Sequence, residues 1–284
     1  AQLLPPGDVH DAVRPVIRRD PEGLRRPSFL LRLVDPTRPS AVPERYHLDT
    51  VPSSNDVILR YADAGAAEHT MVVAREQTAA RGGSGPWLAP PGGLWLTTLW
   101  RPDLDACSAA LLTLASGWGV REGVRRATGV AAGLKWPNDL VVEGKKLGGI
   151  LVEGRVHGHD VVAAGVGVGI NANNPLHAFP PPVARRATSL QAITARDVDM
   201  PALLESVAQG LREARALLAS PAQVVRAFGS CWTQKGQEVR LDTGHTMIEG
   251  RAERIDADGC LVVRTLATEH RVDDTSLAKF VRVV

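Results

Sequence analysis

Lysine is the scarcest charged residue in this sequence. The 284 residues include five lysines against 28 arginines, and three of the five, Lys135, Lys145 and Lys146, fall within a dozen residues. Where positive charge serves only solubility, the chain uses arginine. A lysine here indicates a task that suits a compact, mobile ammonium group, such as contact with a phosphate or a reacting carboxylate. The alternative is an ordinary solvated turn, because Gly-Lys-Lys between two apolar runs is also typical of a hairpin end.

Other absences narrow the class of protein. The three cysteines, Cys107, Cys231 and Cys260, are far apart and odd in number, which indicates reduced thiols and not a disulfide framework or a metal site. No apolar run approaches the roughly 18 residues of a membrane span, and the start of the chain shows no signal-peptide pattern. A net charge of +2 without a lysine or arginine run argues against a nucleic-acid partner. We therefore expect a globular protein of the cytoplasm, with no membrane and no DNA partner.

The pattern of the chain changes twice. Residues 1–45 are rich in proline and arginine, and PSFLLRLV is their one candidate strand. Residues 46–232 mix apolar strands with amphipathic helices, which are expected from Ser53 or Ser54 to Gly65, over 105–128 and over 201–218. Residues 233–284 contain short strands and turns, as in a small antiparallel barrel. The sequence thus predicts an α/β fold of mixed sheet and helices, with a barrel after it and an extension of unknown role before it.

Two glycine-rich stretches suggest close approach of another group. In ARGGSG, Arg81 is a forked donor for a carboxylate or phosphate, although such a loop can also be a plain connector. In GVGVGINAN, Gly165, Gly167 and Gly169 alternate and so share one face of a strand. A loop follows them instead of a helix, which excludes the dinucleotide-binding motif, and there is no phosphate-binding P-loop. A nucleotide would need a site of another construction.

Four blocks together resemble the catalytic domain of the biotin protein ligase family. They are VPSSND, AREQTAARGGSGPW, LKWPNDLVVEGKKLGGILVE and GVGVGINAN, in the order and approximate spacing of that family. The resemblance covers about residues 46 to 232, and the tail over 233–284 resembles the family's SH3-like domain. Residues 1–45 are too short and too proline-rich for the winged helix-turn-helix of repressor-type members.

The resemblance implies an activity and a set of binding residues. Family members join biotin to ATP as biotinyl-5′-adenylate and then transfer biotin to one lysine of a biotin carboxyl carrier domain of acetyl-CoA or a related carboxylase. Biotin is the substrate, ATP with Mg²⁺ the cosubstrate, and no tightly bound metal is expected. Lys146 would be the catalytic lysine, beside the biotin carboxylate and the α-phosphate, whereas Lys145 has no matching role. Residues assigned to biotin are Ser53, Ser54, Asn55, Gln77, Arg81, Gly82, Gly83 and Lys146; those assigned to ATP are Arg81, Trp87, Lys135, Asn138, Asp139 and Asn171, with Asp139 also a candidate Mg²⁺ ligand.

One block departs from the family pattern. Members commonly have Gly-Arg-Gly-Arg-x-Gly-Arg-x-Trp, whereas this chain has Ala-Arg-Gly-Gly-Ser-Gly-Pro-Trp from Ala80 to Trp87, so Gly83 stands where a second arginine usually lies. The departure leaves one alternative open, a catalytically weak biotin-binding or lipoate-type relative. A biotin-responsive regulator is a second alternative, and the lack of a helix-turn-helix pattern argues against it. The oligomeric state, including a homodimer, is also open. For Trp95 and Trp100 we expect core packing.

Overall fold

The computed structural model describes residues 42–83, 85–242, 246–273 and 278–282. Most of the extension over 1–45, with its candidate strand PSFLLRLV, lies outside the described residues. The helices are α1 (Ser54–Asp63), α2 (Ala110–Thr128), α3 (Pro181–Ala184), α4 (Leu190–Thr194), α5 (Met200–Leu217) and α6 (Pro221–Gly229), with short 3-10 helices at Ala106–Ser108 and Leu176–Ala178. The strands are β1 (Arg45–Val51), β2 (Met71–Gln77), β3 (Arg81–Gly82), β4 (Gly85–Pro86), β5 (Leu94–Trp100), β6 (Gly133–Lys135), β7 (Asp139–Val142), β8 (Lys145–His157), β9 (Asp160–Ile170), β10 (Glu238–Asp242), β11 (Met247–Ile255), β12 (Leu261–Arg264), β13 (Glu269–Val272) and β14 (Ala278–Arg282).

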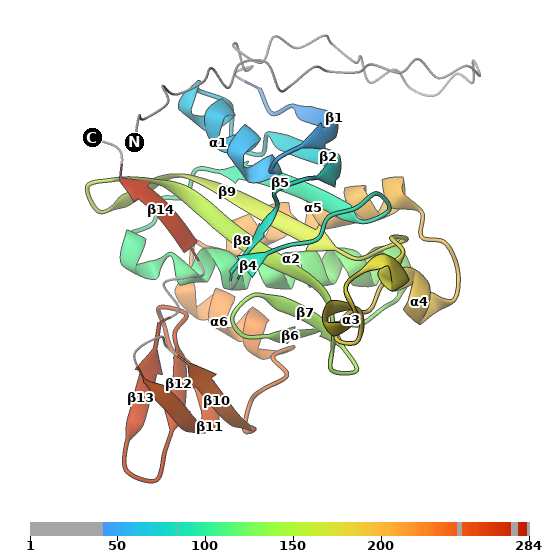
Figure 1. Cartoon of the computed structure of the whole chain (residues 1–284). Coiled ribbons are helices and arrows are strands. Elements are labelled where there is room, and N and C mark those ends of the chain that lie inside the picture. Colours follow the sequence, from blue (N-terminus) through green and yellow to red (C-terminus); the bar gives the residue numbers. More distant parts are fainter. Residues whose placement is uncertain (1–41, 84, 243–245, 274–277, 283–284) are drawn as a thin grey trace, which may run out of the picture.

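A mixed sheet organises the larger part of the molecule. Its strand order is β1-β2-β5-β9-β8-β7-β6, with β14 also paired to β8. The β1–β2 and β14–β8 pairs are parallel, and the other neighbours are antiparallel. Helix α1 packs over β2, β5 and β9, whereas α2 crosses behind β8 and β9 (Figure 1). The predicted α/β class with a mixed sheet is confirmed.

Strand β5 lies between two hydrophobic cores. Leu96 and Trp100 belong to the larger core, which includes residues of α2 and α5. Trp95 and Leu99 belong to the smaller core, which includes the apolar side of α1. Successive strand residues point to opposite faces, so Thr97 shares the α1 face with Trp95 and Leu99. Both tryptophans are fully buried, which confirms that they are core residues.

The C-terminal tail forms a small sheet, but its last strand lies elsewhere. Strands β10 to β13 make a four-stranded antiparallel sheet, which fits the predicted SH3-like domain without a closed barrel. The FVRVV segment was expected in that same unit, whereas β14 pairs with β8 of the large sheet (Figure 1). Local pattern identified the strand but could not identify its partner, because β8 lies more than a hundred residues earlier in the chain.

The small sheet and the large one share apolar packing. Ile248 and Leu261 belong to the same buried cluster as Trp136, which precedes the Pro-Asn-Asp turn. The Trp136 indole Nε1 donates to the Gly259 carbonyl oxygen at 3.1 Å. The boundary near residue 232 therefore stays a prediction, and the two parts are in direct contact across it.

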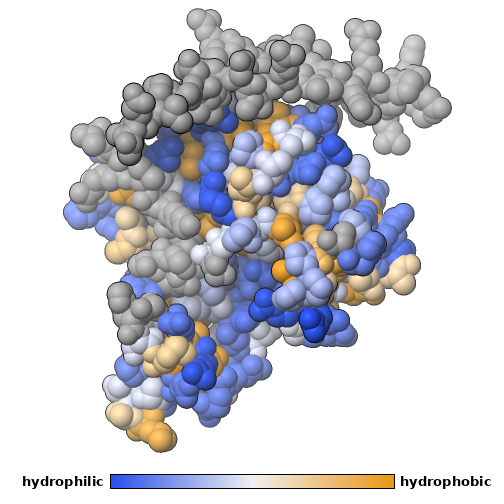
Figure 2. All heavy atoms as spheres, in the orientation of Figure 1, coloured by the Kyte–Doolittle hydropathy of each residue, from blue (hydrophilic) through white to orange (hydrophobic). Residues whose placement is uncertain are grey.

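Exposed apolar side chains are scattered over the described surface. The large ones lie in different segments, and the face drawn in Figure 2 mixes hydrophilic and hydrophobic residues. Among the described residues, no helix combines the length and apolar character needed to cross a membrane. The large apolar residues that are exposed on the described surface are Val42, Leu88, Val162, Val183, Ile193, Met247 and Leu266.

Candidate functional site

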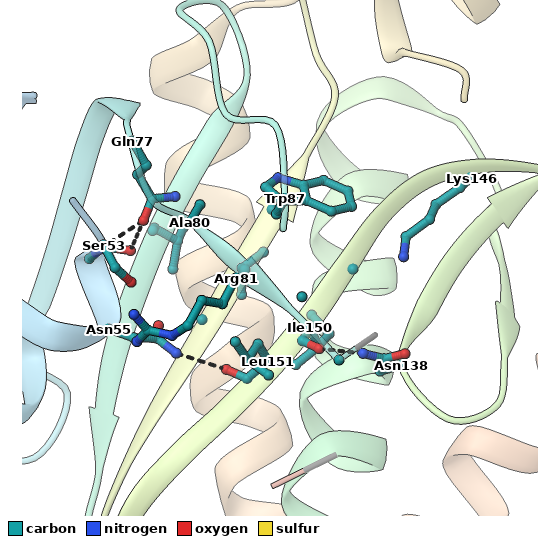
Figure 3. Close-up of a pocket in the computed structure, with 18 residues that line it drawn as sticks. Ser53, Asn55, Gln77, Ala80, Arg81, Trp87, Asn138, Lys146, Ile150 and Leu151 are labelled. Carbon is teal, nitrogen blue, oxygen red and sulfur yellow. Dashed lines mark hydrogen bonds between the residues drawn. The ribbon is translucent and has the colours of Figure 1, made fainter. Parts of the chain in front are cut away.

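A pocket opens on the α1 face of the sheet. The start of α1 and Gln77 of β2 line one side, and Lys146 and Asn138 line the other, with Trp87 above and Arg81 between them (Figure 3). Most of the residues that the sequence assigned to biotin or ATP therefore meet in one place. The lining residues are Ser53, Ser54, Asn55, Gln77, Ala80, Arg81, Gly82, Gly83, Trp87, Leu96, Asn138, Lys146, Gly149, Ile150, Leu151, Gly167, Val168 and Gly169.

The polar residues at the start of α1 are buried and point into the pocket. Ser53 occupies the N-cap position with extended backbone angles, but its side chain makes no capping hydrogen bond. Its hydroxyl is therefore not committed to the helix. The Ser54 amide donates to Gln77 Oε1 at 2.7 Å, which fixes the orientation of the Gln77 amide. Ser53, Ser54 and Asn55 are each less than 5% exposed.

The alternating glycines of β9 admit side chains from the α1 face. A Cβ atom added at Gly167 would lie 2.4 Å from Asn55 Oδ1, and one at Gly169 would lie 2.9 Å from Trp87 Nε1. Real Cβ atoms do not approach so closely, so these positions must be glycine while Asn55 and Trp87 stay in place. The prediction that another group approaches this face is confirmed, and the approaching groups belong to the pocket wall.

The Arg81 guanidinium is held by two carboxylates of the protein. Its Nη1 and Nη2 donate to Asp56 at 3.1 and 2.6 Å, and its Nε and Nη2 donate to Glu153 at 3.1 and 2.9 Å. These bonds, first to Asp56 and then to Glu153, raise the pKa of Arg81 still further above its ordinary value. The fork that was expected to hold a ligand anion is thus filled by the chain itself, and it anchors the glycine-rich loop.

Lys146 lies between an acid and an aromatic ring. Its Nζ is 2.5 Å from Asp139 Oδ1 and 5.1 Å from the centre of the Trp87 ring. Cation–π contact of this kind is favourable within about 6 Å. The lysine side chain is 38% exposed, so its ammonium group remains accessible from the pocket. Lys145 is exposed and does not line the pocket, in keeping with a solvated turn.

Three residues assigned to ATP are not among those that line the pocket. Lys135 ends β6 and is exposed, opposite Asp139 in the hairpin register. Asn171 is buried, donates to the Thr188 carbonyl oxygen and accepts from Asn174. Their roles toward ATP stay predictions, as does a Mg²⁺ role for Asp139, which the structure pairs with Lys146.

Sequence reasoning missed two buried polar residues beneath the pocket. Glu153 is 7% exposed, and Thr97 is fully buried on the α1 face of β5. Both hydrogen-bond to Asn55. The signal for Glu153 was an acidic residue in the otherwise apolar run LGGILVEG, because a carboxylate in a buried strand needs a partner. Thr97 carried no signal, since threonine is common in strands.

Sequence comparison identifies the class of protein. The profile of the Biotin/lipoate A/B protein ligase family matches residues 50–171. The biotin–[acetyl-CoA-carboxylase] ligase of Paracoccus denitrificans is 33% identical over 218 residues, covering 75% of this chain and 90% of that protein. On this coverage and identity, the chain belongs to the biotin protein ligase family.

Two further relatives show the extent of the match. The bifunctional ligase/repressor BirA of Bacillus subtilis is 34% identical over 164 residues, which are 57% of this chain and 50% of that protein. The chain thus spans about half the length of this relative. Biotin protein ligase from Aquifex aeolicus, solved in complex with biotin and ATP, has a TM-score of 0.67 at 27% identity, covering 81% of this chain and 95% of that one.

Proposed function

We propose that this chain is a biotin protein ligase. It forms biotinyl-5′-AMP from biotin and ATP and then transfers the biotinyl group to a lysine of a biotin carboxyl carrier domain. The observation that supports this most is the pocket itself, which combines the Ser53–Asn55 wall with Lys146 in a chain of this family. Serine hydroxyls and carboxamides suit the donors and acceptor of a cyclic urea, and an ammonium group suits a carboxylate.

The first chemical step joins two anions. A carboxylate oxygen of biotin attacks the α-phosphorus of ATP, the bond to the β-phosphate breaks, and pyrophosphate leaves. Lys146 is the residue that offsets the charge of the carboxylate and of the α-phosphate, because it lines the pocket and its stem can follow the reacting oxygen. Asp139 and the Trp87 ring hold the ammonium group in position before the substrates arrive.

The second step needs little from the pocket besides orientation. The amine of the carrier lysine attacks the carbonyl carbon of biotinyl-AMP, AMP leaves, and the amine loses a proton. Water must be excluded from the mixed anhydride in this step, because hydrolysis would convert biotinyl-AMP back to biotin and AMP. The glycine-rich loop lines the pocket, and Arg81 ties it to the sheet through Glu153, so we assign this task to the loop.

A Mg²⁺ ion would sit on the phosphates of ATP. Among the described residues, no cluster of three or more histidine, cysteine or acidic side chains could hold a metal by itself. Mg²⁺ commonly uses one or two carboxylates together with substrate phosphates, and Asp139 is an acid of the pocket region that fits this pattern. Bound there, the ion would lower the negative charge that the biotin carboxylate must approach.

The test is transfer with purified components. The chain is incubated with ATP, Mg²⁺, a biotin carboxyl carrier domain and either biotin or lipoate, and pyrophosphate release and carrier mass are measured. The proposal expects a single added biotinyl group, and none on a carrier whose target lysine is replaced by arginine. Lipoate transfer without biotin transfer would establish the lipoate-type alternative, and biotin binding without pyrophosphate release would leave only a binding protein.

A further inference from the structure

A continuous row of hydrogen bonds runs beneath the pocket wall. Asn55 Nδ2 donates to Glu153 Oε2 at 2.7 Å, and Thr97 Oγ1 donates to Asn55 Oδ1 at 2.6 Å. The Ser54 hydroxyl lies 2.7 Å from Thr97 Oγ1 and 3.0 Å from Gln77 Oε1. Glu153, Asn55, Thr97 and Ser54 are buried, and Gln77 is partly exposed. The row therefore links a buried carboxylate to the three residues that face the pocket.

The carboxylate fixes the direction of the hydrogen bonds from Glu153 through Asn55 to Thr97. An ionised Glu153 can only accept, so Asn55 must turn its NH₂ toward it and its Oδ1 toward Thr97. The single proton of Thr97 goes to that oxygen. The Ser54 hydroxyl lies 2.7 Å from Thr97 Oγ1 and 3.0 Å from Gln77 Oε1, and it donates its single proton to one of these two oxygens.

These directions determine which groups the row offers to a ligand in the pocket. The Ser54 oxygen has already donated its proton and can only accept through a lone pair, and Asn55 offers a carbonyl oxygen. Gln77 accepts from the Ser54 amide, so its NH₂ group is turned away from Ser54 (Figure 3). Ser53, which makes no capping bond, keeps a hydroxyl proton. The wall thus carries two acceptors and two donors.

Arg81 is the charged partner of Glu153 in this place. The Glu153 side chain is only 9% exposed, and a buried carboxylate stays charged only when it is paired. The arginine donates to both of its oxygens, at 3.1 and 2.9 Å. Asp56 accepts hydrogen bonds from the other edge of the guanidinium and so keeps the Arg81 side chain oriented toward Glu153.

We propose that Glu153 is a positioning residue that, through Asn55 and Thr97, sets the hydrogen-bond direction of the pocket wall so that it recognises a cyclic urea. A urea ring offers two N–H donors and one carbonyl acceptor, which match the two acceptors and the donors of the wall. A dithiolane ring offers neither and is disfavoured. This inference rests on the proposed function, because it names the groups that select biotin at the same site.

The first test replaces the charge but keeps the shape. In Glu153→Gln, the new amide can give its oxygen to Arg81 and its NH₂ to Asn55, which reverses the row. We expect the KM for biotin to rise about tenfold or more, as expected for one hydrogen bond that no longer matches its partner, and to rise more than the KM for ATP. The matched control is Glu122→Gln, which removes an arginine-paired carboxylate of similar exposure, 12%, on α2 away from the pocket.

A second variant covers the case in which Glu153→Gln does not fold. Thr97→Val removes the middle hydroxyl and leaves the Arg81–Glu153 pair intact. It should raise the KM for biotin selectively as well. Combined with Glu153→Gln, it should add little, because both changes interrupt one row.

The outcomes separate this inference from the proposed function. If the wild-type chain releases no pyrophosphate with biotin and ATP, the proposed function fails. If the wild type is active and Thr97→Val keeps a wild-type KM for biotin, the inference fails alone. Equal rises in the KM values for biotin and ATP would show a general loss of structure and would also overturn it.

Discussion

Lys146 brings an ammonium group to the wall of the pocket, within reach of Asp139 and Trp87. Lys146→Ala should lower the rate of adenylate formation on the order of 100-fold, the size typical for loss of one group that stabilises developing charge. Lys145→Ala should match the wild type, since that side chain is exposed and outside the pocket. Pyrophosphate release at saturating biotin and ATP measures both. Equal, small effects would show that the turn is only a solvated hairpin end.

Gly83 is the loop residue that bears on how long biotinyl-adenylate stays bound. Arg81 is occupied by two carboxylates, so it is not free to replace the second arginine of the family loop. An arginine fork on the adenylate phosphate is worth about 1.5–3 kcal/mol, or one to two decades in retention. A Cβ atom at Gly83 would meet only Asn138 Nδ2, at an ordinary 3.5 Å. Gly83→Arg should therefore be tolerated and should slow release of biotinyl-adenylate.

Stopped-flow dissociation of preformed adenylate is the measurement for Gly83→Arg. Labelling of bystander lysines by the wild type should fall in parallel in the variant. If the wild type already retains the adenylate for many minutes and the variant does not differ, another residue performs the task of the missing arginine.

At the scale of the element, strand β9 is shaped by its neighbours. In Gly167→Ala, the added methyl group would lie 2.4 Å from Asn55 Oδ1 and 3.0 Å from the Leu151 carbonyl oxygen. Such overpacking should cost about 1–3 kcal/mol of unfolding free energy, and displacement of Asn55 should weaken biotin binding. Gly229→Ala in α6 is the control, since a Cβ atom there meets nothing within 4 Å.

Urea unfolding and calorimetric titration with biotin test this pair of variants. We expect Gly229→Ala to be neutral or slightly stabilising, because alanine favours helix over glycine. Wild-type biotin affinity in a folded Gly167→Ala protein would contradict the requirement for glycine at this contact.

Elements with a strong local pattern could be predicted from the sequence. The strand with the alternating glycines is β9, and the helices α2 and α5 overlap the ranges expected over 105–128 and 201–218. Strand β1 was missed because it is an edge strand in which only Tyr46 and Val51 are buried, so its pattern is weak. In the site, the family motifs located the residues that face the pocket. They could not locate Glu153 or Thr97, whose roles depend on contacts across the sheet, nor the pairing of Arg81 with Glu153.

At the scale of the whole molecule, the shared core predicts that the two parts unfold together. Leu261 of the small sheet is fully buried in the same cluster as Trp136. Leu261→Ala should cost about 2–5 kcal/mol, as expected for a leucine removed from a packed core. That loss should appear in a single transition, seen equally by Trp fluorescence and by far-ultraviolet circular dichroism. Two separate transitions, with only one of them shifted, would show independent domains.

The glycine column of β9 has a consequence for any attempt to redesign ligand preference. Because Gly167 and Gly169 offer no side chains, this part of the pocket floor is backbone and cannot be altered by ordinary substitution. A change in ligand preference therefore requires substitution of the side chains that pack against these glycines, such as Asn55 and Trp87. A mutational library that seeks variants able to bind another acid should therefore randomise the start of α1 and the loop before Trp87, and leave β9 unchanged.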